Sequence, residues 1–383
     1  MLKHKTHYGE SLNLNWQSVL HVGTRVVVGK GTLAKLPDLL AQIDAGKKIL
    51  LLKPPNLFIQ EIDYLKTELH AKSISVHVLE IPDGEACKSI DYLIKVWNAM
   101  HQLKFSRKDT LVGFGGGSVT DIAGFAASTY LRGINLVTIP TTLLAQVDAA
   151  IGGKTAVNFH GGKNLIGNYY FAKAVIVDTD TLATLPRTQF TSGLAEVIKY
   201  ALLEKTIANE TEYSMGPRPL LQVLENSIAD LAWNNELLPG ILIASMKMKL
   251  AVVAQDALES GLRRCLNLGH TLAHALESTS NFALSHGEAV AIGIAFALHL
   301  AVSHKQLSES DSHRALNLLE VVGLPTKMSA GISVPILLDH LFRDKKREGE
   351  AIKMILPKDE LGMVDYNELI KREEIEQRLT HFL

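Results

Sequence analysis

The sequence predicts an α/β protein in two parts: a parallel sheet flanked by helices, followed by a half built from helices alone. In the first part, apolar runs of strand length alternate with helical patterns, which is typical of a parallel sheet. From about residue 189 the strand signals fade and long helical periodicities replace them. Because 383 residues exceed one ordinary hydrophobic core, we expect two domains, covering residues 1–187 and 188–383.

The elements follow from the spacing of apolar residues. Short runs rich in Val, Ile and Leu are expected to be strands, at RVVVG (25–29), KILLLK (48–53), ISVHVLEI (74–81), DTLVGF (109–114) and AVIVD (174–178). Among them, IDYLIKVWNAMHQL (90–103) has the period of a helix. Further helices are expected in the second half, at 195–204, 237–254, 287–302 and 315–323.

The segment RRCLNLGHTLAHALESTSNFALSHGE (263–288) concentrates histidines and glutamates. His270 and His274 are four residues apart, so on a helix their imidazoles share one face, and His286 follows just before an apolar run. Imidazole is a preferred zinc ligand, and a catalytic zinc takes about three protein ligands. The segment indicates a metal or substrate site, although polar residues on a half-buried helix would give the same spacing.

Two further clusters place charges on apolar helices. Glu196 and Lys199 stand three apart in GLAEVIKYALL, where burying either one alone would be costly, so they pair with each other or bind a ligand. Lys249, Glu259 and Arg263 precede the histidines and offer an amine, an acid and a fixed cation. A simple salt bridge remains an alternative for the first pair.

Anion-binding signals lie in the first half. Gly115, Gly116 and Gly117 follow an expected strand and precede an expected helix, whose N-terminus would favour a pyrophosphate; a tight turn would explain them almost as well. The segment 139–170 then combines glycines with cations and amides and has few acids, a composition that suits a phosphorylated ligand. Its candidate polar residues are Asp148, Lys154, Asn158, Lys163 and Asn164.

Taken together, these segments resemble the 3-dehydroquinate synthase family. The resemblance runs from about residue 26 to 362, and its most specific blocks are PDGEACKS, GGGSVTDIAGFAASTYLRG, PTTLLAQVDAAIGGKTAVN, GGKNLIGNYY, SGLAEVIKY, ESGLRRCLNLGHTLAHALE, LSHGEAVAIG and DKKREG. It implies a Rossmann-like NAD domain followed by a helical metal and substrate domain. It also implies the use of NAD and a divalent metal, zinc or cobalt, to convert the sugar phosphate 3-deoxy-D-arabino-heptulosonate 7-phosphate (DAHP) into 3-dehydroquinate and phosphate in the shikimate pathway.

The same resemblance implies roles for individual residues. The metal ligands would be Glu196, His270 and His286. The catalytic residues would be Glu259, His274, Lys199, Arg263 and Asn267. Substrate binding is implied for Arg132, Asp148, Lys154, Asn164, Lys249 and Lys346, with Arg132 reaching across a homodimer interface. NAD binding is implied for Asn56, Glu85, Lys88, Gly115, Gly116, Gly117, Ser118, Asp121, Thr141, Thr142 and Lys163.

The chain departs from the family pattern mainly at the cofactor site. Where the family usually has an Asp that contacts the adenosine ribose, this chain has Pro54 in ILLLKPPNLF, so weaker NAD binding is expected. Two alternatives remain open. One is a sister cyclase of the valiolone or deoxy-inosose type, which tends to lose the Arg and Asn of GLRRCLN; the other is a metal-dependent polyol dehydrogenase, which lacks the GGKTAVN and GGKN segments.

Composition indicates a soluble cytoplasmic enzyme. The 39 basic and 40 acidic residues nearly balance and form no long basic block, which argues against a nucleic-acid partner. Cys87 and Cys265 are too few for a disulfide framework and suggest a reducing compartment. The N-terminus has no signal-peptide pattern, and the apolar stretch 289–302 is too short to span a bilayer, so no membrane partner is expected.

Overall fold

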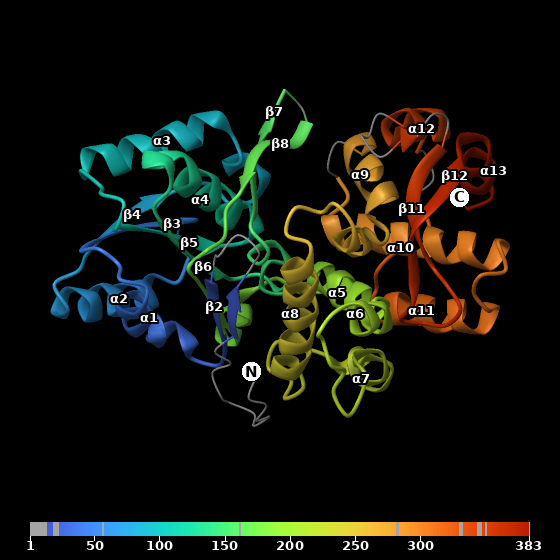
Figure 1. Ribbon diagram of the computed structural model, residues 1–383, viewed down its shortest axis with the longest axis horizontal. Coiled ribbons are helices and arrows are strands. Elements are labelled where there is room, and N and C mark those ends of the chain that lie inside the picture. The colour runs from blue at the N-terminus through green and yellow to red at the C-terminus, as the bar shows by residue number, and fades with distance from the viewer. Residues whose placement is uncertain are drawn as a thin grey trace. The chain divides into compact units, whose positions relative to one another are not determined.

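The computed structural model describes residues 14–17, 23–55, 57–160, 162–280, 283–328, 332–342, 347–348 and 351–382. The chain divides into two compact units (Figure 1). The first comprises Met1–Pro186 with Glu236–Met246, and the second comprises Arg187–Asn235 with Lys247–Leu383. Two predicted site residues, Asn56 and Lys346, lie outside the described residues.

The first unit contains a seven-stranded sheet with the order β1-β2-β9-β6-β5-β3-β4. Its strands are β1 (Leu14–Gln17), β2 (Gly23–Gly29), β3 (Lys48–Lys53), β4 (Ser75–Glu80), β5 (Thr110–Gly115), β6 (Asn135–Pro140) and β9 (Ala174–Asp178). All neighbours pair in parallel except β1, which is antiparallel to β2. The predicted parallel sheet is therefore confirmed, with the five predicted strands in place. Strand β6 was missed because its run ends in Pro140, a residue that usually marks a loop or strand end.

Helices cover both faces of this sheet. Helices α1 (Leu36–Gln42) and α2 (Ile59–Ala71) pack on one face, where their leucines form an apolar core with alternate residues of β3, β5, β6 and β9. Helices α3 (Ile90–Gln102) and α4 (Gly117–Thr129) lie on the opposite face in Figure 1. A separate hairpin, β7 (Lys154–Phe159) and β8 (Gly162–Tyr169), was not predicted as strands because its glycines and polar residues are typical of a loop.

The glycine run forms the turn between β5 and α4, as predicted. Its neighbours leave little space for side chains: a Cβ on Gly116 would lie 3.3 Å from the Thr142 side chain, and one on Gly117 would lie 2.9 Å from Ala149. The turn therefore presents backbone at the N-terminus of α4. Such a helix end carries unpaired N–H groups and a partial positive charge, which suit an anion.

The second unit is mainly helical, as predicted, with α10 (His286–Ser303) at its centre. Around it are α5 (Arg187–Ala201), α6 (Glu204–Glu210), α7 (Leu220–Ser227), α9 (His270–Thr279), α11 (Glu309–Val321), α12 (Val334–Phe342) and α13 (Arg372–Phe382). Helix α8 (Leu238–Gln255) is divided, since its first turns belong to the first unit and the rest to the second.

The second unit also contains a small antiparallel sheet, which the prediction of a purely helical half did not include. Its strands are β10 (Arg347–Glu348), β11 (Ala351–Pro357) and β12 (Val364–Lys371). The run in β11, AIKMILP, is short and apolar, and such a run cannot be assigned to a strand or a helix from its periodicity alone.

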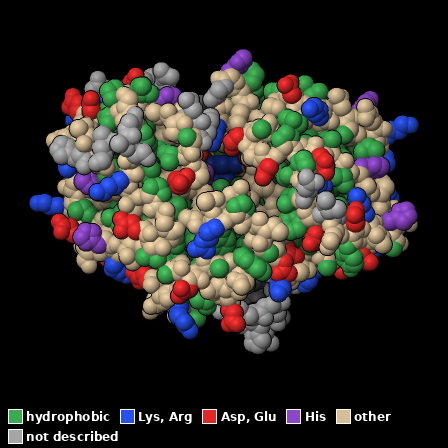
Figure 2. Space-filling model, turned by 180° about the vertical axis from the view of Figure 1, so that it is seen from behind, with side chains coloured by type: hydrophobic (Ala, Val, Ile, Leu, Met, Phe, Trp, Pro, Cys, Tyr) green, Lys and Arg blue, Asp and Glu red, His purple; other side chains and the backbone are tan. Residues whose placement is uncertain are grey.

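Within the described residues, two helices, α8 and α10, are long and apolar enough to cross a membrane if judged by length and composition only. In α10, 72% of the residues are buried inside the fold, because the helix packs against α5, α9, α11 and β11. A helix that is apolar all round is expected at the centre of a helical core. On the face shown in Figure 2, basic and acidic side chains are interspersed, in keeping with the balanced composition.

Candidate metal and substrate site

Three helices of the second unit bring Glu196, His270 and His286 together. Glu196 lies in the middle of α5, and the two histidines are the first residues of α9 and α10. The start of α10 is fixed by a capping box, in which Ser285 and Glu288 each bond the other's backbone N–H. The site is thus built from two helix starts placed against a third helix.

Glycines next to each histidine allow these helices to pack closely. A Cβ on Gly293 of α10 would lie 1.9 Å from the carbonyl oxygen of Gly269, which immediately precedes His270. Gly269 has a φ of +78°, a backbone conformation that favours glycine. Gly287, next to His286, donates its N–H to the Ser192 hydroxyl at 3.0 Å. The contacts that pack the helices therefore also set the positions of the imidazoles.

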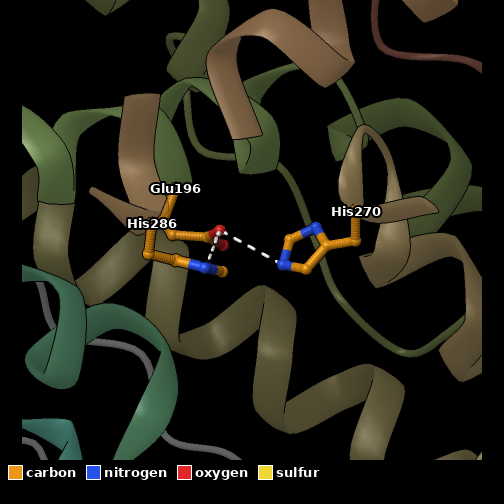
Figure 3. Close-up of side chains that lie close together, drawn as sticks. All are labelled: Glu196, His270 and His286. Atoms are coloured by element: carbon orange, nitrogen blue, oxygen red, sulfur yellow. Dashed lines mark ion pairs between the residues drawn. The ribbon is translucent and has the colours of Figure 1, made fainter. Parts of the chain in front are cut away.

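The three side chains point toward one another (Figure 3). Nε2 of His270 and Nε2 of His286 each lie 3.5 Å from Oε1 of Glu196. One ligand atom from each residue lies within 4.8 Å of the others. Two ligands of a tetrahedral zinc, at their usual bond lengths, would be about 3.4 Å apart. The spacing and the donor set, one carboxylate and two imidazoles, therefore fit a divalent metal of the zinc type.

Hydrogen bonds on the far side of each ring fix its tautomer. Nδ1 of His270 donates to the carbonyl oxygen of Leu268 at 3.1 Å, and Nδ1 of His286 donates to Oε1 of Glu277 at 3.3 Å. A ring that binds a metal carries its proton on Nδ1 alone, which leaves its Nε2 lone pair directed toward Glu196. Histidines that bind metals usually have such an outer partner.

The two imidazoles have opposite pKa shifts. Burial, reinforced by the Lys199 ammonium, holds the pKa of His270 well below its ordinary value. Burial also opposes protonation of His286, but hydrogen bonds to Glu196 and Glu277 outweigh it and raise the pKa of His286 to about 9. Near neutral pH, His286 therefore carries the positive charge that balances the buried carboxylates. A metal ligand must be deprotonated, so a cation would take the place of this proton.

Several predicted residues are buried cations or acids of the second unit. Lys199 is 1% exposed and pairs with Glu196 one turn away on α5. Lys249 near the end of α8 and Arg263 are also buried, and Arg263 donates to the carbonyl oxygen of Ala257 at 2.5 Å. Buried cations need a counter-charge, which the carboxylate or phosphate of a substrate can supply.

The loop between α8 and α9 brings Glu259 and Asn267 together. The Asn267 amide donates to the Glu259 carboxylate, and Glu259 has a φ of 61°, which is uncommon for a residue with a side chain. Asp256 holds this loop by accepting hydrogen bonds from the backbone N–H groups of Ser260, Gly261 and Arg263 at 2.9, 2.7 and 3.0 Å. The loop is therefore fixed locally around the acid.

His274 lies one turn after His270, with its ring edge-on to that of His270 and the centroids 5.6 Å apart. It is exposed, unlike the buried His270. Its Nε2 and Nδ1 atoms are not part of the group formed by Glu196, His270 and His286. That two histidines bind the metal while His274 transfers protons stays a prediction, and this arrangement is compatible with it.

In the first unit, predicted cofactor and phosphate residues form one polar cluster beside α4. The buried Lys88 pairs with Asp121 of α4 and donates to Asn164 of β8. Glu85 lies 4.0 Å from the Lys163 ammonium and accepts a hydrogen bond of 2.7 Å from Asn158. The cluster thus links the segment before α3, helix α4 and the hairpin.

The remaining predicted residues of the first unit lie near the ends of strands. Thr141 follows β6 and donates its N–H to the Gly115 carbonyl at 2.9 Å, while Thr142 caps the following turn by accepting from Ala145 at 3.2 Å. Ser118 lies in the first turn of α4, Asp148 lies in the turn at Ala145–Ala149, and the exposed Lys154 begins β7. Arg132 is exposed with a φ of 63°.

The sequence analysis missed three residues that shape the site: Ser192, Asp256 and Glu277. Glu277 had a detectable signal, because it is seven residues after His270 and so shares a helix face with it. Ser192 accepts from the N–H of Gly287, which is distant in sequence. Asp256 accepts from backbone N–H groups of an irregular loop, and such a loop has no periodicity from which the contact could be predicted.

Comparison with known proteins identifies the family. The model of the 3-dehydroquinate synthase N-terminal domain matches residues 78–192, and that of the 3-dehydroquinate synthase C-terminal domain matches residues 193–347. The chain belongs to the 3-dehydroquinate synthase family. The 3-dehydroquinate synthase of Nostoc punctiforme is 37% identical over 92% of this chain and 95% of its own. That of Pyrococcus abyssi is 43% identical over 77% of this chain and 82% of its own.

A solved structure outside the 3-dehydroquinate synthases shares the two-part fold. It is a 2-epi-5-epi-valiolone synthase from Streptomyces hygroscopicus with NAD⁺ and Zn²⁺ bound. It is 28% identical in sequence, covers 94% of this chain and 97% of its own, and superposes with a TM-score of 0.81. The resemblance stated from the sequence is therefore confirmed, and the protein is an enzyme of the 3-dehydroquinate synthase type.

Proposed function

We propose that the protein converts DAHP into 3-dehydroquinate and phosphate, using NAD catalytically together with a divalent metal, zinc or cobalt. The observation that carries the proposal is the cluster of Glu196, His270 and His286, found in a chain of the 3-dehydroquinate synthase family. The valiolone synthase with the same fold holds NAD⁺ and Zn²⁺. Both Nε2 atoms lie at distances from Oε1 of Glu196 that suit the same type of metal.

The metal and the nicotinamide would supply the redox chemistry. When bound, the metal acts as a Lewis acid that makes a substrate hydroxyl easier to deprotonate, and NAD accepts and returns a hydride. The protein's residues would position the substrate and stabilise its charges. Glu196, His270 and His286 would hold the metal, and Lys199 would balance the Glu196 carboxylate with which it pairs.

The substrate carries two anionic ends, and the chain offers cations for each of them. Arg263 and Lys249 would bind the C1 carboxylate, because a guanidinium can form two parallel charge-assisted hydrogen bonds to it. Lys154, Asn164, Lys346 and Arg132 would bind the phosphate. Glu259, held against Asn267, and the exposed His274 would transfer protons during phosphate elimination and ring closure.

The first unit would bind NAD at the turn between β5 and α4. Its backbone N–H groups, at a helix start where Gly116 and Gly117 leave no side chain in the way, suit the pyrophosphate. In this proposal residues 1–187 form the NAD-binding domain, which also supplies Arg132, Lys154 and Asn164 to the substrate phosphate, and residues 188–383 form the metal- and substrate-binding domain. We further propose that the enzyme is cytoplasmic and forms a homodimer in which Arg132 contributes to the partner's phosphate site.

A product assay tests this proposal. The purified protein is supplied with DAHP, NAD⁺ and Zn²⁺, and then 3-dehydroquinate, phosphate and NADH are each quantified over many turnovers. We expect one phosphate and one 3-dehydroquinate per DAHP, with no net NADH, because the hydride returns in each cycle. NADH accumulating in proportion to substrate would instead support a polyol dehydrogenase. Cyclisation of sedoheptulose 7-phosphate in preference to DAHP would support a sister cyclase.

A further inference from the structure

Helix α9 contains a buried carboxylate that the proposed chemistry does not use. Glu277 is 3% exposed, although a glutamate is seldom fully buried unless it is paired. It follows His270 by seven residues and therefore lies on the same face of the helix, toward the metal cluster. Such a buried charge needs a partner that compensates for the loss of its hydration.

One partner of Glu277 is the imidazole of His286. Oε1 of Glu277 lies 3.3 Å from Nδ1 of His286, while Nε2 of the same ring lies 3.5 Å from Oε1 of Glu196. The ring is thus held between two carboxylates, one on each nitrogen. The carboxylate on the Nδ1 side belongs to α9, and the one on the Nε2 side belongs to α5.

We infer that Glu277 is a positioning residue for the metal site, acting through His286; this inference rests on the metal assignment in the proposed function. By accepting the Nδ1 proton, Glu277 selects the tautomer whose Nε2 lone pair faces the metal position. It also fixes the rotation of the imidazole ring and makes Nε2 a stronger base. Outer carboxylates of this kind typically change metal affinity 10- to 100-fold.

The histidines differ in the partner that fixes them. His270 donates to a backbone carbonyl oxygen, that of Leu268, which a side-chain substitution cannot remove. His286 depends on a side chain, so its orientation can be changed by a single substitution. His286 is also the more exposed of the two ligands, with 28% of its side chain accessible against 10% for His270. Packing therefore restrains it less, and the hydrogen bond to Glu277 contributes more.

The test compares the zinc affinity of the full-length wild type with that of Glu277→Gln and Glu277→Leu, measured by competition with a chromophoric chelator. Leu removes the acceptor and should weaken zinc binding about 100-fold. Gln keeps a neutral acceptor for the Nδ1 proton and should recover part of that loss, to a deficit of about 10-fold. A purely structural role for Glu277 would not produce this graded zinc affinity with rescue by Gln.

Glu288→Gln serves as the matched control. Glu288 lies in the first turn of α10 and accepts a hydrogen bond from the Ser285 N–H, so it supports the same helix start without contacting the Nδ1 atom of His286. Its zinc affinity should remain within about 3-fold of the wild type, since Gln can still accept that bond. Thermal unfolding of the metal-free proteins shows whether each variant is folded at the assay temperature.

The possible outcomes separate this inference from the proposed function. If the wild type itself binds no zinc, the metal assignment fails. If the wild type binds zinc and both Glu277 variants bind it equally well while folded, only the role of Glu277 is overturned. Equal losses in Glu277→Gln and Glu277→Leu would also contradict it, because the loss would then not depend on an acceptor for the Nδ1 proton. An equal loss in Glu288→Gln would contradict it as well, because it would indicate a general disturbance of the start of α10.

Discussion

The carbonyl oxygen of Ser192 on α5 lies where a side chain on Gly287 of α10 would have to be, since a Cβ built there would be 2.1 Å away. Gly287 adjoins His286, and Ser192 is one turn before Glu196. Substituting Gly287→Ala should therefore separate α5 from α10 and move His286 away from Glu196. We expect a loss of at least about 2 kcal/mol of unfolding free energy, as for overpacked cores, together with a loss of zinc binding.

Gly240→Ala is the control for this prediction. Gly240 lies in α8, and a Cβ there would have nothing within 4 Å. Alanine should be tolerated and should stabilise the protein by about 0.5–1 kcal/mol, the usual difference between Gly and Ala in a helix. Chemical denaturation measures both variants. A Gly287→Ala protein with wild-type stability and one bound zinc would show that the close contact is not needed.

The parts of this protein that the sequence could predict are those governed by periodicity and by local composition. The strand at 48–53 and the helix at 90–102 follow from apolar spacing, and the cluster of Glu196 with two histidines follows from motifs. The Asp256 bonds and the contact of Gly287 with Ser192 could not be predicted, because they depend on how separate segments meet. The division of α8 between two units also leaves no mark in its uniformly apolar sequence.

A second prediction concerns Asp256, which holds the loop that carries Glu259. Burial opposes its ionisation, but hydrogen bonds from the backbone of Gly261, Ser260 and Arg263 outweigh this effect and lower the pKa of Asp256. Asp256→Asn would replace one of these acceptor oxygens by an NH₂ group, which cannot accept a hydrogen bond from a backbone N–H. The substitution should lower the free energy of unfolding by about 1–3 kcal/mol. It should also lower kcat/KM, because Glu259 would no longer be held at its uncommon φ.

The pH dependence of this effect has a definite sign. Because the folded-state pKa is the lower one, the ionised Asp256 stabilises the protein above its unfolded-state pKa, near 4, and this contribution is lost as the pH falls through the folded-state pKa. The difference in free energy of unfolding between wild type and Asp256→Asn should be constant between roughly pH 5 and 7, where the carboxylate is ionised in both states. The difference should shrink below about pH 4. A difference that grew on acidification would rule out this role.

The third prediction is that both thiols are inert in the folded protein. Burial raises the pKa of Cys87 to about 12, and it does the same for Cys265. At pH 8 only about 10⁻⁴ of each thiol would be ionised, and the thiolate is the reactive form. Iodoacetamide should therefore label the native protein at least about 100-fold more slowly than the chain in denaturant. Rapid labelling at pH 8 without loss of structure would show that the thiols are accessible and ionised.

The fourth prediction concerns substrate choice through Arg263, which is 1% exposed. DAHP has a carboxylate that Arg263 can bind, whereas sedoheptulose 7-phosphate has none and would forgo this charge-assisted interaction at a cost of roughly 2–5 kcal/mol. Arg263→Ala should lower kcat/KM for DAHP by about 10²-fold or more. Arg263→Lys keeps the charge without the paired hydrogen bonds, so its kcat/KM for DAHP should lie between that of the wild type and that of Arg263→Ala.

Zinc content and thermal stability are measured on the same Arg263 preparations, so that a loss of substrate binding can be separated from a loss of the metal or the fold. Arg263 also bonds the Ala257 carbonyl, and a modest loss of stability is therefore expected in both variants. An Arg263→Ala enzyme that remained as active on DAHP as the wild type would show that the carboxylate is bound elsewhere.

The most direct test of the account is a zinc titration of chelator-stripped protein, with 3-dehydroquinate formation from DAHP as the readout. If Glu196, His270 and His286 hold the one metal on which turnover depends, stripped protein should be inactive. Its rate should then rise with added zinc and level off at about one zinc per chain, and His286→Ala should neither retain zinc nor recover. Full activity in the stripped protein, or equal recovery in His286→Ala, would contradict the account.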